Sequence, residues 1–211
     1  MTMVYNSRNL PMKKLFSSFL MLAAMSLTFV ACEKEPEPEP EPEIKSNCKI
    51  YKAQYGIDED GAVYIFEIFS NTLQVNADLT EITGSGDDCI VMMYASAQGD
   101  GYPTAKEYNV IAIEELPEEP TDCVIGGTAY QGKPIGTYAY VVEEGKAVDA
   151  LLCTGGSVKF EGNASKGVMT AKLTFVNTSG ETVEREYIYS GAMSLQEMAM
   201  NAPESKVKRI K

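Results

Sequence analysis

The chain has 211 residues, a formal net charge of −12 and no histidine. The absence of histidine excludes Ser-His and Cys-His catalytic pairs, histidine general bases and histidine metal ligands. The acidic balance argues against nucleic acid as a partner, because that affinity depends on Lys and Arg contacts to phosphates.

A signal peptide is predicted over residues 1–31, with Met12 as its natural start. Lys13 and Lys14 precede an uncharged, apolar run over Leu15–Ala31. The run has 17 residues, the lower limit for a membrane-spanning helix, and no basic flank follows it. A plain transmembrane anchor and an ordinary secretory signal are the alternatives.

The end of this run, Phe29-Val30-Ala31-Cys32, resembles a bacterial lipoprotein signal. The resemblance implies that Cys32 becomes the lipidated first residue of the mature chain and holds it to the membrane. Each buried methylene of an acyl chain such as palmitate contributes ~0.8 kcal/mol, so two or three chains give stable anchoring. From Cys32 onward the chain carries 15 basic and 30 acidic residues, because residues 1–31 hold three of the 18 basic residues and none of the acidic ones.

Residues 32–44 are predicted to form a lipidated cysteine followed by a disordered spacer. Glu and Pro alternate up to Glu43. Proline fixes φ and removes backbone donors, so we expect a stiff, extended strip roughly 30 Å long at ~3.1 Å per residue. Acidic residues directly after the lipidated cysteine resemble the surface-export signal of Bacteroidota-type lipoproteins. This resemblance implies an outer-membrane protein that faces the cell surface, with a periplasm-facing protein as the alternative.

Residues 45–193 are predicted to form one all-β domain. Short segments rich in β-branched and aromatic residues alternate with Gly, Asp and Asn turns. Such spacing is typical of an antiparallel sandwich of roughly eight to ten strands, with an up-and-down barrel as the alternative. The predicted strands are 48–55, 62–70, 89–97, 107–113, 123–130, 137–142, 147–153, 156–161, 168–176 and 182–190. Residues 194–211 form a tail, either with a short helix that begins at a Ser194–Glu197 capping box or as a continuing strand.

Four further motifs are turn-like. They are Tyr55-Gly56, Pro134–Tyr138, Gly155–Val158 and Tyr189–Gly191. Their arrangement resembles that of small, uncharacterised Bacteroidota outer-membrane lipoproteins. The resemblance implies a β fold in the cell envelope and brings no activity or site residues.

Besides Cys32, the chain has four cysteines, an even number in a compartment that permits disulfides. Either they pair, in one of three ways, or they are small buried hydrophobes. No two of them have C-x-x-C spacing, so no redox motif or zinc site is suggested. These cysteines are Cys48, Cys89, Cys123 and Cys153.

No residue set predicts catalysis, and no metal or cofactor is expected. Glu184 and Glu186 share a strand face, which suits a solvated surface better than a hydrolase pair. Asp58–Gly61 is interpreted as a hairpin turn rather than a calcium loop. Ser46–Lys49 fits S-x-x-K, but it leads into a strand, where the two side chains point to opposite faces. Tyr102 precedes Pro103 in a Gly-rich loop and is the tyrosine we expect to be exposed for ligand contact.

These observations favour a lipid-anchored, non-catalytic surface module that binds a glycan or protein. Membrane contact is expected through Cys32 alone. The basic residues of the tail, Lys206 to Lys211, are interpreted as solvated. The alternatives are an assembly subunit of an envelope complex or fimbria and, less favoured, a carboxylate-dependent hydrolase.

Overall fold

The computed structural model describes residues 44–57, 61–76, 81–96 and 102–198. The predicted signal peptide, Cys32 and the Glu/Pro spacer therefore lie outside the described residues, as does most of the Asp58–Gly61 turn. In the described part of the chain no helix is long and apolar enough to cross a membrane.

The fold is all-β, which confirms the predicted class. The only helical element in the described residues is a 3₁₀ turn, η1 (Ile113–Glu115). The strands are β1 (Cys48–Ile57), β2 (Ala62–Ser70), β3 (Gln74–Val75), β4 (Ile82–Thr83), β5 (Gly86–Ala95), β6 (Glu107–Ile111), β7 (Cys123–Ile125), β8 (Thr128–Tyr130), β9 (Lys133–Ile135), β10 (Tyr138–Glu143), β11 (Lys146–Asn163), β12 (Lys166–Val176), β13 (Thr182–Gly191) and β14 (Gln196–Glu197).

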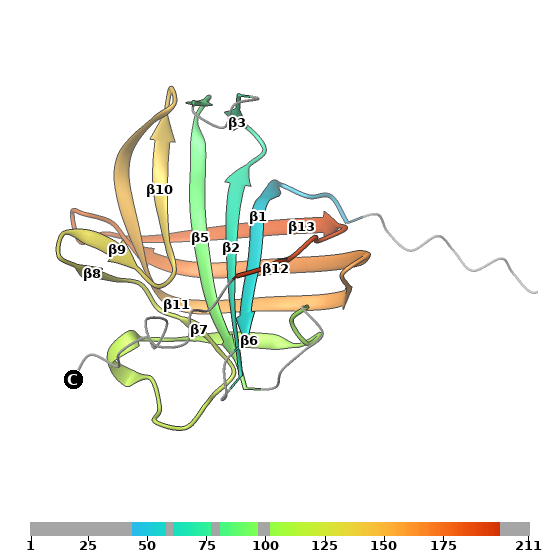
Figure 1. The fold of residues 1–211 in the computed structure, drawn as a ribbon. Helices are drawn as coiled ribbons and strands as arrows, with labels where there is room; N and C mark the ends of the chain where they lie inside the picture. The colour runs from blue at the N-terminus through green and yellow to red at the C-terminus, as the bar shows by residue number, and fades with distance from the viewer. Residues whose placement is uncertain (1–43, 58–60, 77–80, 97–101, 199–211) are drawn as a thin grey trace, which may run out of the picture. The chain divides into compact units, whose positions relative to one another are not determined.

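Two layers of strands pack face to face. Figure 1 shows β1, β2, β5 and β10, here called the first layer, running across the direction of β11, β12 and β13, the second layer. A closed ring joins the layers: β11 pairs with β6, β6 with β7, β7 with β5, and β10 pairs with both β5 and β11. The structure thus has the packed layers of the predicted sandwich and also a closed five-strand ring. The ring is not an up-and-down barrel, because only β6–β7 and β10–β11 of its neighbouring pairs are consecutive in the chain, and β6 and β7 are parallel.

Strand β11 forms the corner between the layers. The sequence predicted two strands, 147–153 and 156–161, but the structure has one strand of 18 residues. Its first half pairs with β10, its second half pairs with β6, and the pairing with β12 is shifted between Cys153 and Gly155. Gly156 has φ +104°, and a Cβ there would collide with the Lys172 carbonyl oxygen. A strand that changes sheets commonly bends at such a bulge, and glycine permits it.

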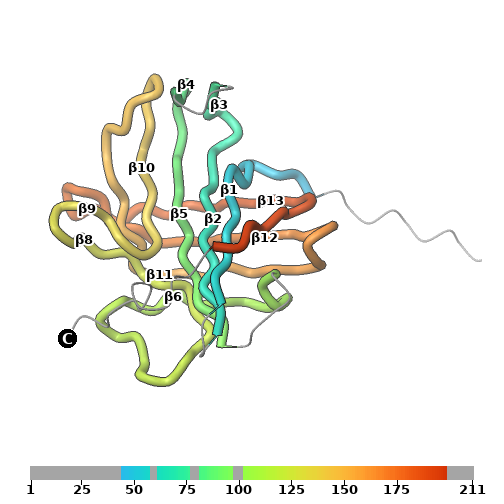
Figure 2. The backbone as a smooth tube through the Cα atoms, viewed as in Figure 1, coloured from blue at the N-terminus to red at the C-terminus, as the bar shows by residue number. Residues whose placement is uncertain are grey.

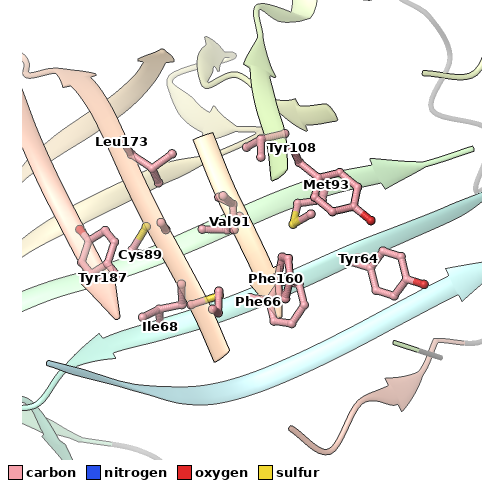
Figure 3. Close-up of a cluster of buried hydrophobic side chains, with 14 of the residues drawn as sticks. Tyr64, Phe66, Ile68, Cys89, Val91, Met93, Tyr108, Phe160, Leu173 and Tyr187 are labelled. Atoms are coloured by element: carbon pink, nitrogen blue, oxygen red, sulfur yellow. The ribbon is translucent and has the colours of Figure 1, made fainter. Parts of the chain in front are cut away.

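The core lies between the layers and follows the two-residue period of the strands. In β5 every second residue from Asp87 to Ala95 is buried, and the residues between are half-buried. Phe66 of β2 and Phe160 of β11 meet across the layers, with ring centroids 5.3 Å apart. Figure 3 shows these rings together with Tyr64, Met93 and Tyr108.

Two small hairpins flank the first layer (Figure 2). β3–β4 packs Val75 and Ile82 against a second small core of Phe69, Leu73 and Val142. β8–β9 leads directly into β10, and residues from it lie beside the first layer.

The two ends of the domain cover sheet edges. Asn47 donates its backbone N–H to the Ile188 carbonyl of β13 (2.9 Å), and its Oδ1 accepts from the Ile188 N–H (2.7 Å). Its Nδ2 also donates to the Glu186 carbonyl (2.8 Å). At the other end, β14 pairs in parallel with β1, so the segment proposed as helix or strand forms a short strand.

Candidate functional site

The expectation that Tyr102 is exposed is wrong. Its side chain is only 9% exposed, and its ring packs edge-on against Phe160, with centroids 6.1 Å apart. The hydroxyl donates to the Glu161 carbonyl (3.4 Å), in a space that a Cβ on Gly167 would fill. The loop therefore turns its aromatic residue inward, because Gly167 leaves room for the ring over the core.

The four described cysteines are free, buried thiols. This agrees with the interpretation as small hydrophobes rather than as disulfide partners. Burial raises the pKa of Cys48 to about 12 and the pKa values of Cys123 and Cys153 to about 11. Burial also raises the pKa of Cys89. The thiols are thus protonated and inert at neutral pH.

The carboxylates of β13 lie on a solvated face, as the sequence indicated. Glu186 forms an exposed ion pair with Lys172 (3.4 Å), and Glu184 is exposed. The Ser46 hydroxyl accepts the Ser190 N–H (2.8 Å), so it belongs to the edge contact with β13 and not to a catalytic pair.

A groove on the outer face of the first layer is the candidate site. The alternation that buries one face of β2 and β5 turns Ile65 and Glu67, and Ile90 and Met92, outward. Tyr138 of β10 lies directly opposite Ile90. The groove encloses about 340 Å³ and is lined by Lys52, Gln54, Ile65, Glu67, Ile90, Met92, Pro134, Ile135, Gly136 and Tyr138.

The apolar character of this groove departs from the usual pattern. An antiparallel sheet normally turns its polar face to water. The second layer follows that rule, because Thr170, Lys172 and Thr174 occupy the outer face of β12. The first layer instead presents aliphatic, thioether and aromatic side chains at the centre of its outer face.

Two half-buried carboxylates lie on the same face. Burial and then the charge of Glu67 raise the pKa of Asp88 to about 6. Burial also raises the pKa of Glu67, and Lys52, opposite it on β1, partly offsets that effect. The buried Oδ1 of Asp88 has no hydrogen-bond partner. Among the described residues neither carboxylate forms an ion pair.

The preceding residue, Asp87, has the opposite environment. It points into the core, where its Oδ2 accepts from Arg185 Nε (2.9 Å) and from the Tyr187 hydroxyl (3.1 Å). Tyr187 lies among the core side chains in Figure 3. Asp87 thus has an ion-pair partner and a hydrogen-bond donor, whereas the next residue of β5, Asp88, forms no ion pair among the described residues.

Tyr138 is the aromatic residue that lines the groove in the described part of the chain, and further tyrosines lie on β1, β8 and β10. Tyr138 meets Tyr140 edge-on, with centroids 5.5 Å apart. Burial raises the pKa of Tyr138, and the nearby charges of Asp88 and Glu67 raise it further. Tyr51 stacks on Phe69 of the second small core, with centroids 4.7 Å apart, and is partly exposed. Tyr130 is exposed on the β8–β9 hairpin.

A second hollow of about 460 Å³ lies beside Tyr102 and Pro103. The described residues that line it are Tyr102 and small or polar residues around Asn163, and none of them is charged. In the described residues no three His, Cys, Asp or Glu side chains converge to hold a metal. The first-layer groove is therefore the better-defined candidate.

Sequence reasoning missed this groove for an identifiable reason. The predicted strand began at Cys89, whereas β5 begins at Gly86 and carries Asp87 and Asp88 within the sheet. The available signal was Glu67, the one charged residue in an otherwise apolar predicted strand. No family model, curated protein or solved structure matches this chain.

Proposed function

We propose that this protein is a lipid-anchored module of the outer-membrane surface that binds a ligand without catalysis, and that the first-layer groove is its binding face. The observation that carries the proposal is the contrast between the two layers. The outer face of β12 is polar, whereas Ile65, Ile90, Met92 and Tyr138 occupy the outer face of the first layer.

Exposed apolar surface of this kind commonly marks an interaction site, because it is costly to leave in water. A few polar groups in an apolar surface are also typical of ligand sites, where they fix orientation. Glu67 and Asp88 are such groups here, and a rigid sheet holds them in place. The lipoprotein-like signal that ends at Cys32 and the Glu/Pro sequence after it support presentation of the domain at a distance from the membrane.

A ligand screen with a matched pair of variants tests the binding role. Purified protein is titrated with soluble glycans and proteins in a thermal-shift assay. Each ligand that gives a saturable shift is then tested again with Met92→Arg, which fills the groove, and with Thr170→Arg on the outer face of the second layer. We expect Met92→Arg to abolish the shift and Thr170→Arg to retain it. Binding that survives Met92→Arg, or turnover of the ligand, contradicts the proposal.

The location is tested on intact cells. External protease is expected to remove the domain from wild-type cells but not from cells in which the acidic residues of Glu33–Glu43 are changed to Gln. Protection of both proteins would contradict the surface location and favour the periplasm.

A further inference from the structure

We propose that the groove binds an arginine side chain of a protein partner, flanked by Tyr138 and held by two carboxylates: that of Glu67, which lines the groove, and that of Asp88, its diagonal neighbour beside the groove. The inference rests on the proposed function, since it names the class of ligand for the same groove. It follows from charge, from the spacing of the two carboxylates and from the open shape of the groove.

The two carboxylates leave this face with more negative than positive charge. Asp88 Oδ1 is buried and has no hydrogen-bond partner, and neither carboxylate forms an ion pair within the described part of the chain. Among the described residues Lys52 is the one basic residue that lines the groove. It lies on β1 directly opposite Glu67, and β2 separates it from Asp88 on β5. A cation from outside would supply the charge that the face lacks, and a buried acceptor without a partner is costly.

The sheet register sets the spacing of the two acceptors. Glu67 lies opposite Ile90, and Phe69 lies opposite Asp88, so Glu67 and Asp88 are diagonal neighbours on adjacent strands. Diagonal neighbours in an antiparallel pair are about 7–8 Å apart, within reach of long side chains. A guanidinium presents five N–H donors in a planar fork and can bond to two carboxylates at once. An ammonium is a compact point charge and fits such a pair less well.

The aromatic neighbour favours the same group. Tyr138 lies in the cross-strand row that contains Ile90 and Glu67. Besides burial, the charges of Asp88 and Glu67 raise the pKa of the Tyr138 hydroxyl, so all three side chains share one region of the face. A guanidinium stacks on aromatic rings while its edges remain free to donate.

The open shape argues for a side chain on a protein rather than a free small cation. Small-molecule sites usually bury most of the ligand surface, and a groove on a sheet face cannot do so alone. A protein partner brings its own surface to cover the groove and exclude water from the ion pairs. Residues 1–43 hold four of the chain's 18 basic and six of its 30 acidic residues, which leaves 14 basic and 24 acidic residues in 44–211. Such a domain attracts a basic partner.

An NMR titration with paired peptides tests this inference. The probe is a seven-residue Gly/Ser peptide with a central arginine, and its control carries citrulline, which is neutral and nearly isosteric. We expect saturable shifts of amide signals in β2, β5 and β10 with the arginine peptide at millimolar concentration and none with citrulline. Asp88→Asn and Glu67→Gln should each weaken binding about tenfold or more, as expected when a charge partner is removed. Glu184→Gln, an exposed carboxylate on β13, should leave binding within about twofold.

The alternatives have distinct outcomes. Equal binding of citrulline, equal binding of tetramethylammonium, or shifts that map to β13 would overturn the inference. Concentration-dependent self-association that Met92→Arg abolishes would identify a second copy as the occupant instead. A neutral glycan whose binding is lost with Met92→Arg would overturn the arginine inference and leave the proposed function intact. If no ligand responds to Met92→Arg, the proposed function itself fails. A Tm of Asp88→Asn at or above the wild-type value would show that its loss of binding is not a loss of fold.

Discussion

Replacing Asp88 by Asn should stabilise the folded protein at neutral pH. The carboxylate of Asp88 is half-buried, its Oδ1 has no hydrogen-bond partner, and its pKa is raised to about 6 from the ordinary 3.8. A raised pKa means that the folded state favours the protonated acid. The ionised side chain therefore opposes folding at neutral pH, and an amide of the same shape removes that charge.

The magnitude follows from linkage between protonation and folding. A difference of about two pKa units at ~1.36 kcal/mol per unit gives an upper limit of about 3 kcal/mol. Solvent screens a half-buried group, so about 1–1.5 kcal/mol is the realistic gain. For a domain of this size each kcal/mol corresponds to ~2–4 °C in Tm, so we expect Asp88→Asn to raise Tm by about 3–5 °C at pH 7.5.

The pH dependence provides the decisive assay. The contribution of Asp88 to stability is fully present below the unfolded pKa of about 4 and is lost as pH rises through about 6. Thermal unfolding followed by circular dichroism should therefore show wild type and Asp88→Asn converging near pH 4 and separating by pH 7.5. Asp87→Asn is the matched control and should lower Tm, because it leaves Arg185 in a partly buried site without its charge partner. A decrease in Tm for Asp88→Asn at pH 7.5, or a difference that does not change with pH, would refute the reasoning.

Three further experiments test the fold. Gly156→Ala should destabilise the protein by about 2–4 kcal/mol in urea unfolding, because the residue has a left-handed φ and its new Cβ would collide with the Lys172 carbonyl oxygen. Gly132→Ala is the control: Gly132 also has a positive φ but lies in open space, so the change should cost about 1 kcal/mol. Equal costs would contradict the role of Gly156 at the corner. Asn47→Ala removes two side-chain hydrogen bonds to the β13 edge and should cost about 1–2 kcal/mol. Hydrogen exchange at the Ile188 amide should accelerate in that variant, and unchanged protection would show that the contact is unimportant. The buried thiols should resist a thiol reagent at neutral pH until the protein unfolds, and rapid labelling of the native protein would contradict their burial.

The sequence determined the local features of the strands. Segments rich in β-branched and aromatic residues placed β2, β12 and β13 within a residue or two of their observed ends. The gap left between the predicted strands 137–142 and 147–153 is a turn in the structure, with Gly145 at φ +77°. It also indicated that Glu184 and Glu186 belong to a solvated face. These features depend on residues close together in the chain, so a linear pattern is sufficient to reveal them.

The tertiary structure alone decided which faces are covered and what lies beside them. Alternation shows that Asp87 and Asp88 point to opposite faces, but only the packing of β13 over the core gives Asp87 its partners Arg185 and Tyr187. Likewise, only the space above Gly167 explains why Tyr102 is buried, and only the bulge in β11 carries one strand through both layers. The groove is formed by strands far apart in the sequence. Its apolar and acidic side chains become a site because sheet register places them side by side, and register depends on contacts that no local pattern contains.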